Sequence, residues 1–367
     1  MDSIYNIKRR EGLKMNFAIV GCGFIAKKHA LAISKIEGAT LVAVCDRVPE
    51  LMEPYVFEYG AQPYTSLEEL LKDETIDIIN ICTPSGTHAS IAELAASYGK
   101  HIIVEKPIAM TMEETERIIV AAEKNDVKLA VVHPNRFRPV VMKLQEILDQ
   151  RLLGKISHAL CIVNWNRGQE YYDQAPWRGT KEHDGGVLMN QAIHNLDLLL
   201  SFLGNPAEVF SMEATRLRDI ECEDVSTGLI RFESGVLATV QASTTVYPKN
   251  YEESITIFGE KGTVKIGGMN ALYFETLDIQ GMDETTIAEY INGVKADPWG
   301  IPGHEQVIQD MIHSISEERQ PAITGQDGKN ALELVLAFYE SAELNKPISI
   351  TREGETACQP SKAYQKI

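Results

Sequence analysis

The sequence has no apolar run near the length of about 20 residues that a membrane-spanning helix needs. Basic residues are scarce, because 35 Lys and Arg against 52 Asp and Glu give a formal net charge of −17. This balance argues against a nucleic-acid footprint or an anchor for anionic membranes. Six cysteines occur without Cys-x-x-Cys spacing, and there is no His-x-x-x-His pair. We therefore expect no disulfide framework, no metal site and a reducing, cytoplasmic location.

The length of 367 residues is enough for two domains, and the hydrophobic fraction of 44% is ordinary for a globular chain. We expect an N-terminal extension over residues 1–14, a first domain over 15–135 and a second over 136–367. The extension contains basic residues but no following apolar core, so it does not resemble a signal peptide. Met15 is an alternative natural start.

Short apolar segments alternate with amphipathic ones in the first domain. Strands are expected at 16–20, 41–45, 77–82, 101–105 and 128–133, and helices near 24–37, 66–73, 88–98 and 113–124. Strands that alternate with helices indicate a parallel sheet with right-handed crossovers. Because these strands are almost continuously apolar, both faces of the sheet should be buried. The pattern predicts an α/β Rossmann domain.

The second domain has a different pattern. After a helix near 139–151, the segments 227–232 and 236–241 alternate polar and apolar residues around a Glu233–Gly235 turn, and Gly259–Gly262 reads as a second turn. Helices are expected near 304–318 and 327–345. The pattern predicts an α+β domain with an open-faced, mainly antiparallel sheet. An open sheet needs cover, so we expect a homotetramer or a dimer.

A glycine loop follows the first strand, in the order Gly21-x-Gly23-x-x-Ala26. Gly21 permits a tight turn, Gly23 admits a pyrophosphate, and the helix that begins at Phe24 and Ile25 offers N–H groups to phosphates. The alternative is a simple turn, but the position between a strand and a helix favours dinucleotide binding.

Asp46 ends the second strand, where an acid accepts hydrogen bonds from ribose hydroxyls and repels a 2′-phosphate. This favours NAD as the cofactor. Arg47 beside it is the opposing signal, since arginine can hold a 2′-phosphate. A helix cap is the structural alternative for Asp46.

Two further strand ends carry polar residues. Thr83, Pro84 and His88 follow the strand at 77–82, so they could border the cofactor, or His88 could simply open the next helix. Glu105 and Lys106 end the strand at 101–105. A partly desolvated lysine could exchange a proton with a substrate hydroxyl, and Glu105 could hold the nicotinamide end. The alternative for this pair is a charged surface turn.

Asn190 and His194 lie four residues apart and would share one face of a helix, with Asp197 able to orient the imidazole. The alternative is a satisfied histidine near the core.

These motifs together resemble the glucose–fructose oxidoreductase and inositol dehydrogenase (Gfo/Idh/MocA) family. The resemblance extends from Met15 to about Ile350. It is carried by Gly21-x-Gly23-x-x-Ala26, Thr83-Pro84 with His88, Glu105-Lys106-Pro107, Asn135-Arg136-Phe137, Trp177-Arg178, and Gly185-Gly186 with His194-x-x-Asp197-Leu198. It implies an NAD-binding Rossmann domain, a C-terminal open sheet, and Asn135, Trp177 and Arg178 near the cofactor.

The segment Arg167–Thr180 further resembles bacterial UDP-N-acetylglucosaminuronic acid 3-dehydrogenases, as does Asn190 where many family members have aspartate. This implies oxidation of carbon 3 of a UDP-linked sugar acid, in a pathway to surface polysaccharide. Asn190 cannot serve as a base, so Lys106 or His194 would take the hydroxyl proton. Substrate contacts would come from Lys106, Arg136, Arg167, Tyr171, Tyr172, Asn190 and His194.

Two other functions stay open from the sequence. One is a dehydrogenase of inositol, another polyol or uncharged UDP-N-acetylglucosamine. The other is a non-catalytic dinucleotide sensor, which the presence of both Lys106 and His194 disfavours.

Overall fold

The computed structural model describes residues 14–350, which form two units. Among the described residues, the first unit contains 14–134 and 302–329, and the second contains 135–301 and 330–350. The predicted extension lies outside the described residues except for Lys14. No helix between residues 14 and 350 is long and apolar enough to cross a membrane.

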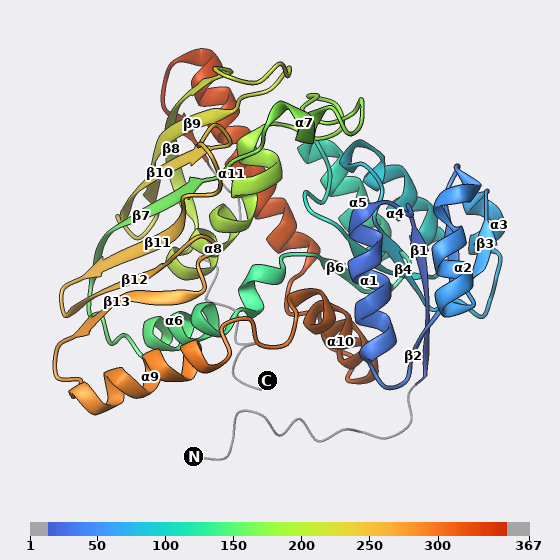
Figure 1. The fold of residues 1–367 in the computed structure, drawn as a ribbon, viewed down its shortest axis with the longest axis horizontal. Coiled ribbons are helices and arrows are strands. Elements are labelled where there is room, and N and C mark those ends of the chain that lie inside the picture. Colours follow the sequence, from blue (N-terminus) through green and yellow to red (C-terminus); the bar gives the residue numbers. More distant parts are fainter. Residues whose placement is uncertain (1–13, 351–367) are drawn as a thin grey trace. The chain divides into compact units, whose positions relative to one another are not determined.

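A six-stranded parallel sheet forms the first unit, in the order β3-β2-β1-β4-β5-β6 (Figure 1). The strands are β1 (Met15–Val20), β2 (Ala39–Cys45), β3 (Gln62–Tyr64), β4 (Ile78–Ile81), β5 (His101–Val104) and β6 (Leu129–Val131). Phe17, Ala18 and Ile19 are fully buried, as strands covered on both faces require. The Rossmann prediction is confirmed. The short edge strand β3 was not predicted, because Gln62-Pro63-Tyr64 has no apolar pattern.

Most helices of this unit follow the predicted positions, but no helix was predicted near residues 53–59. They are α1 (Phe24–Lys35), α2 (Glu53–Tyr59), α3 (Leu67–Leu71), α4 (His88–Ser97), α5 (Met112–Lys124) and α10 (Gly303–Ser316). The sequence-based boundary placed α10 in the second domain, whereas the structure places residues 302–329 in the first unit. The reason is tertiary: α10 packs against α1, and Thr324 forms an antiparallel bridge with Ala130 of β6.

An eight-stranded mixed sheet forms the second unit, in the order β13-β12-β11-β7-β10-β9-β8-β14. Its strands are β7 (Ile156–Asn164), β8 (Pro206–Ala214), β9 (Val225–Phe232), β10 (Leu237–Ser243), β11 (Glu252–Gly259), β12 (Gly262–Gly267), β13 (Tyr273–Ile279) and β14 (Ile348–Ser349). Only β7 and β10 pair in parallel. Both predicted turns close antiparallel hairpins, β9–β10 and β11–β12, so the mainly antiparallel sheet is confirmed.

Helices cover one face of this sheet (Figure 1). They include α6 (Pro139–Asp149), α8 (Ile193–Leu203) and α11 (Gly325–Leu344), while α9 (Glu284–Ala296), which was not predicted, packs beside β13. Phe338 of α11 lies against Gly228 of β9 so closely that a Cβ there would sit 2.5 Å from its ring. The opposite face of β8, β9 and β10 exposes Met212, Leu229 and Leu237, each at least 50% accessible.

We expect this face to be covered by a second copy of the chain, because exposed apolar side chains on a sheet favour self-association. Light scattering of dilute protein should give the mass of a dimer or tetramer. The double substitution Leu229→Glu and Leu237→Glu should lower that mass. Phe57→Glu is the control, since Phe57 is 94% exposed but lies on α2. A monomer mass for the unmodified protein would contradict the prediction.

Candidate active site

The glycine loop lies where β1 meets α1. Gly21 has φ +90°, and a Cβ on it would come within 2.8 Å of the Cys82 backbone and of Thr83. Any side chain at Gly21 would therefore clash with the neighbouring strand end. Around Gly23 there is open space where a Cβ would be, at the N-terminus of α1. The loop thus leaves room and N–H groups for a phosphate.

Asp46 lies directly beside this loop, after β2. Its Oδ2 accepts a hydrogen bond from the Cys22 N–H at 2.8 Å, and its Oδ1 accepts one from the Val48 N–H at 2.9 Å. These contacts fix the carboxylate next to the glycines, where the sequence placed it. Arg47 is exposed.

The segment after β4 also borders the loop, because Thr83 limits the space at Gly21. His88 begins α4 and is fully buried. Its Nδ1 lies 2.9 Å from the Pro107 carbonyl oxygen and its Nε2 lies 3.0 Å from that of Thr83. Burial lowers the pKa of His88. Through these contacts His88 links the segments that follow β4 and β5. Its direct contact with the cofactor remains a prediction.

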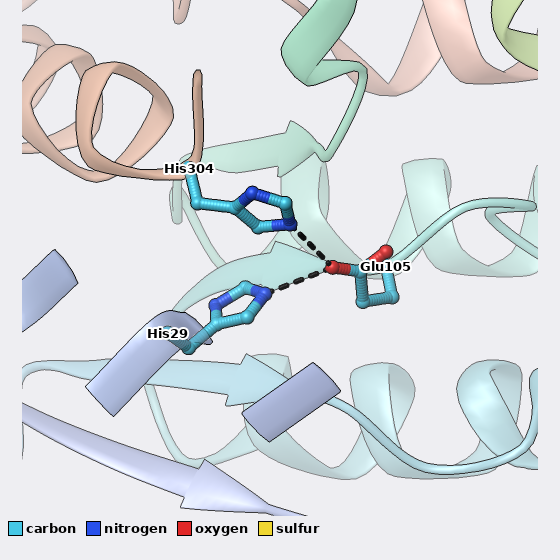
Figure 2. Close-up of side chains that lie close together, drawn as sticks. All are labelled: His29, Glu105 and His304. Atoms are coloured by element: carbon cyan, nitrogen blue, oxygen red, sulfur yellow. Dashed lines mark hydrogen bonds and ion pairs between the residues drawn. The ribbon is translucent and has the colours of Figure 1, made fainter. Parts of the chain in front are cut away.

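Lys106 follows β5 and is half-buried, and its neighbour Glu105 is buried. The Glu105 Oε1 lies 2.9 Å from Nε2 of His29 and 3.4 Å from Nε2 of His304 (Figure 2). Its Oε2 accepts a hydrogen bond from the Lys106 N–H at 3.2 Å. Burial by itself raises the pKa of Glu105, but the hydrogen bonds from the two histidines hold it well below its ordinary value. The Glu105 carboxylate is thus committed to protein partners, and its predicted contact with nicotinamide is untested.

The same three residues have the geometry of metal ligands. The ligand atoms of His29, Glu105 and His304 lie within 4.8 Å of one another, the one such group within residues 14–350. Sequence spacing did not reveal it, because the three side chains come from α1, the end of β5 and the start of α10.

In the second unit, Asn190 and His194 lie at a junction of two helix types. Leu188–Ala192 forms a π-helix that runs directly into α8. Asn190 donates a hydrogen bond through Nδ2 to Asp184. The expected regular helix is therefore replaced by a wider turn at Asn190, a feature that often marks functional sites.

Buried acids hold this π-helix in place. The Glu223 Oε1 accepts hydrogen bonds from the Leu188 N–H at 2.8 Å and from the Tyr339 hydroxyl at 3.2 Å. Burial raises the pKa of Glu223 to about 7. Asp184 accepts a second hydrogen bond from the Gly179 N–H at 2.8 Å. Sequence reasoning assigned no role to Glu223, since its partners are distant in the chain.

Arg136 and Asp197 form a buried bidentate ion pair. Nε of Arg136 donates to Oδ2 of Asp197 at 2.8 Å, and Nη2 donates to Oδ1 at 2.6 Å. The side chains are 5% and 1% exposed. This ion pair was not predicted from the sequence. The contact of Arg136 with an anionic substrate and the orientation of the His194 ring by Asp197 stay predictions.

Arg167 and Arg178 stand in a ladder of aromatic rings. Arg167 lies 4.9 Å from the centre of the Trp165 ring and 5.5 Å from that of Tyr171. Arg178 lies 4.3 Å from Tyr171 and 4.7 Å from Trp177, and it donates a hydrogen bond of 2.6 Å to the Tyr171 hydroxyl. We call these five residues the arginine–aromatic ladder.

Neither guanidinium of the ladder forms an ion pair with any residue in the described range 14–350. Nε of Arg178 is buried without a hydrogen-bond partner there. Two cations around one ring repel each other, and cation–π contacts of about 0.5–2 kcal/mol only partly compensate. The ladder is therefore suited to an anion.

The remaining predicted site residues differ widely in their exposure to solvent. Tyr172 donates a hydrogen bond to the Thr244 hydroxyl at 3.1 Å, and burial raises the pKa of Tyr172 to about 12. Asn135 is 8% exposed, in a short 3-10 helix over Pro134–Phe137. Phe24 is 75% exposed at the first turn of α1, and Ile25 is half-buried. Pro84 lies between Thr83 and the next short helix.

The structure divides the predicted site residues between the two units. The first unit brings together Gly21, Gly23, Asp46 and Thr83 around the glycine loop, and it ties Lys106 to Glu105. The second brings together Arg167, Tyr171, Trp177 and Arg178, and it places Asn190 and His194 at one helix junction. A parallel sheet with a glycine loop at the β1–α1 turn and an acid after β2 defines a dinucleotide-binding dehydrogenase fold.

Comparison with known proteins gives the same class. Residues 15–133 match the oxidoreductase family with the NAD-binding Rossmann fold, and residues 141–265 match the GFO/IDH/MocA C-terminal domain. The chain belongs to the GFO/IDH/MocA oxidoreductase family. Its relatives are NAD-dependent sugar and polyol dehydrogenases, and this protein is an NAD-dependent oxidoreductase of that kind.

Individual relatives differ in the substrate that their names state. The WlbA dehydrogenase from Bordetella pertussis, solved with NADH and UDP-GlcNAcA, superposes with a TM-score of 0.89 at 33% identity over 93% of this chain and 99% of that one. The WlbA dehydrogenase from Chromobacterium violaceum, with the same ligands, gives 0.88 at 35% identity over 93% and 97%. Myo-inositol 2-dehydrogenase of Thermotoga maritima is 26% identical over 92% of this chain and 98% of its own.

The first unit fits NAD. The glycine loop leaves open space at Gly23, at the N-terminus of α1, and Asp46 would lie at the ribose end of the bound cofactor. When bound, NAD supplies the hydride acceptor for oxidation of a carbinol.

Asp46 should make the protein select NAD over NADP, because its carboxylate would repel a 2′-phosphate. We expect NAD to bind at least about tenfold more tightly, a difference of about 1.4 kcal/mol. Asp46→Ala should reduce this ratio, and Arg47→Ala, its exposed neighbour, should not. Calorimetric titration of each protein with NAD and with NADP measures this ratio of affinities. Equal or tighter NADP binding to the unmodified protein would show that Arg47 dominates.

Proposed function

We propose that this enzyme oxidises the carbon-3 hydroxyl of UDP-N-acetylglucosaminuronic acid to a 3-keto sugar, with NAD as hydride acceptor. The single observation that carries the proposal is the arginine–aromatic ladder, whose two guanidiniums have no ion-pair partner among residues 14–350. The ladder lies in the segment that resembles the UDP-sugar enzymes.

The chemistry of the ladder fits such a substrate. A UDP-sugar acid carries a diphosphate and a carboxylate, and guanidinium groups bind both through paired donors. A base such as uracil can stack on aromatic rings. On a chain with a net charge of −17, an anionic substrate needs a concentrated local cation site of this kind.

The proton transfer would fall to Lys106 or His194. As the hydride leaves carbon 3, the hydroxyl proton passes to one of these residues, and the neighbouring donor stabilises the developing negative charge on oxygen. Asn190, held by Asp184, would position a substrate hydroxyl. The 3-keto product is the kind of carbonyl compound that an aminotransferase converts to an amino sugar, which is consistent with a place in surface polysaccharide synthesis.

A dehydrogenase of inositol is the second candidate, because full-length relatives carry that name. A neutral polyol offers no anion to the two ladder arginines. The ladder therefore favours the nucleotide sugar over the polyol.

The test is a substrate panel with purified protein and NAD. UDP-N-acetylglucosaminuronic acid, uncharged UDP-N-acetylglucosamine and myo-inositol are compared by NADH absorbance, and mass spectrometry identifies a product lighter by two hydrogen atoms. The uronate should give the highest kcat/KM. Higher efficiency with the uncharged sugar would overturn the uronate assignment, and turnover of inositol alone would overturn the UDP-sugar assignment.

A further inference from the structure

We propose that His29 and His304 are positioning residues. They act through Glu105 to hold in place the backbone turn after β5 that carries the catalytic Lys106. The proposal rests on the proposed role of Lys106. All the groups belong to the first unit. They join three segments that lie far apart in the sequence: the dinucleotide-binding helix α1, the end of β5 and the start of α10 (Figure 2).

The contacts form a closed network around one carboxylate. Glu105 Oε1 forms a hydrogen bond with Nε2 of His29 at 2.9 Å and lies 3.4 Å from Nε2 of His304, within ion-pair distance. The two imidazole rings meet edge to face with centres 5.3 Å apart. The other oxygen, Oε2, accepts the backbone N–H of Lys106. The orientation of the Glu105 side chain is thus coupled directly to the backbone from which the Lys106 side chain starts.

The position of the proton on the His29 ring follows from a contact with Asn80. Its Nδ2 lies 2.8 Å from Nδ1 of His29, so the amide donates and Nδ1 accepts. The proton of a neutral His29 is then on Nε2, where it is donated to Glu105. Because His29 and Asn80 are at most 1% exposed, water does not compete for these bonds.

The alternative occupant of this cluster is a metal ion. Two histidines and a glutamate suit zinc, which holds such ligands at about 2.0–2.2 Å. However, the direct contact of 2.9 Å between His29 and Glu105 is a normal hydrogen bond, and it already satisfies both atoms without an ion. The hydrogen-bonded network is therefore the reading that the contacts favour, and zinc binding becomes an outcome of the test.

His304→Leu and His304→Gln separate positioning from packing. Glutamine keeps an N–H donor for Glu105, whereas leucine fills similar volume without one. The matched control is His313→Gln, on the same helix and half-buried. Two readouts are used. The first is the rate at which Lys106 is acylated, measured by peptide mass spectrometry relative to the exposed Lys35. The second is kcat with the best substrate of the panel.

We expect His304→Leu to raise the relative acylation rate of Lys106 about threefold or more, because the turn opens more often. We also expect it to lower kcat about tenfold with little change in KM for NAD, since misplacing a catalytic group costs rate more than binding. His304→Gln and His313→Gln should stay close to the unmodified protein.

Equal behaviour of the leucine and glutamine variants would overturn the proposal, as would unchanged acylation in both. Calorimetry with zinc chloride provides the other overturning result: stoichiometric binding to the unmodified protein that His304→Leu abolishes would make the cluster a metal site. Acylation needs no substrate, so a failure of the UDP-sugar assignment would appear in the panel alone and would leave this readout intact.

Discussion

Lys106→Ala should lower turnover by about 10²–10⁴-fold, the usual loss when a positioned acid–base group is removed. NAD binding and the fold should persist, because the glycine loop and Asp46 are separate from the Lys106 side chain and make their own contacts. Steady-state kinetics, calorimetric titration with NAD and thermal unfolding together measure these three properties. Lys27→Ala is the control, since Lys27 is an exposed lysine on α1.

His194→Ala should cause a comparable loss if the two residues act as a unit. In that case the double variant should be little worse than either single variant, because the effects of cooperating catalytic groups are not additive. Near-normal turnover of Lys106→Ala would remove Lys106 from catalysis. Losses that simply multiply in the double variant would show that the two residues act in separate steps.

The second large effect should come from the ladder arginines. Arg167→Gln and Arg178→Gln should each lower kcat/KM for UDP-N-acetylglucosaminuronic acid about 10- to 100-fold, since a lost charged hydrogen bond costs about 1.5–3 kcal/mol. The loss should appear mainly in KM, because these groups would bind the substrate equally before and during reaction.

Comparison with the uncharged UDP-N-acetylglucosamine shows which anion each arginine binds. An arginine that binds the diphosphate should affect both sugars equally, and one that binds the carboxylate should reduce the preference for the uronate. Arg117→Gln is the control, because Arg117 is an exposed residue of α5 that pairs with Glu93. If both ladder variants kept the unmodified kcat/KM with both sugars, the ladder would not be the anion site.

The local elements of this protein could be predicted from the sequence because each is encoded by neighbouring residues. Continuous apolar runs indicated the parallel strands, and alternation around Gly235 indicated an antiparallel hairpin. The glycine loop and Asp46 could be placed together, since consecutive strands of a Rossmann sheet end at one edge. The edge strand β3 and the helices α2 and α9 have no strong periodic pattern, and they were not predicted.

The sequence by itself determined the fold class, the cofactor loop and the strand-end lysine; tertiary structure decided which polar groups pair. Arg136 pairs with Asp197, 61 residues away, and His29 bonds to Glu105 across 76 residues. Neither pairing was predicted. The return of residues 302–329 to the first unit supplies His304. Hydrogen bonds and ion pairs act over a few ångströms between groups that only folding brings together, so spacing along the chain does not encode them.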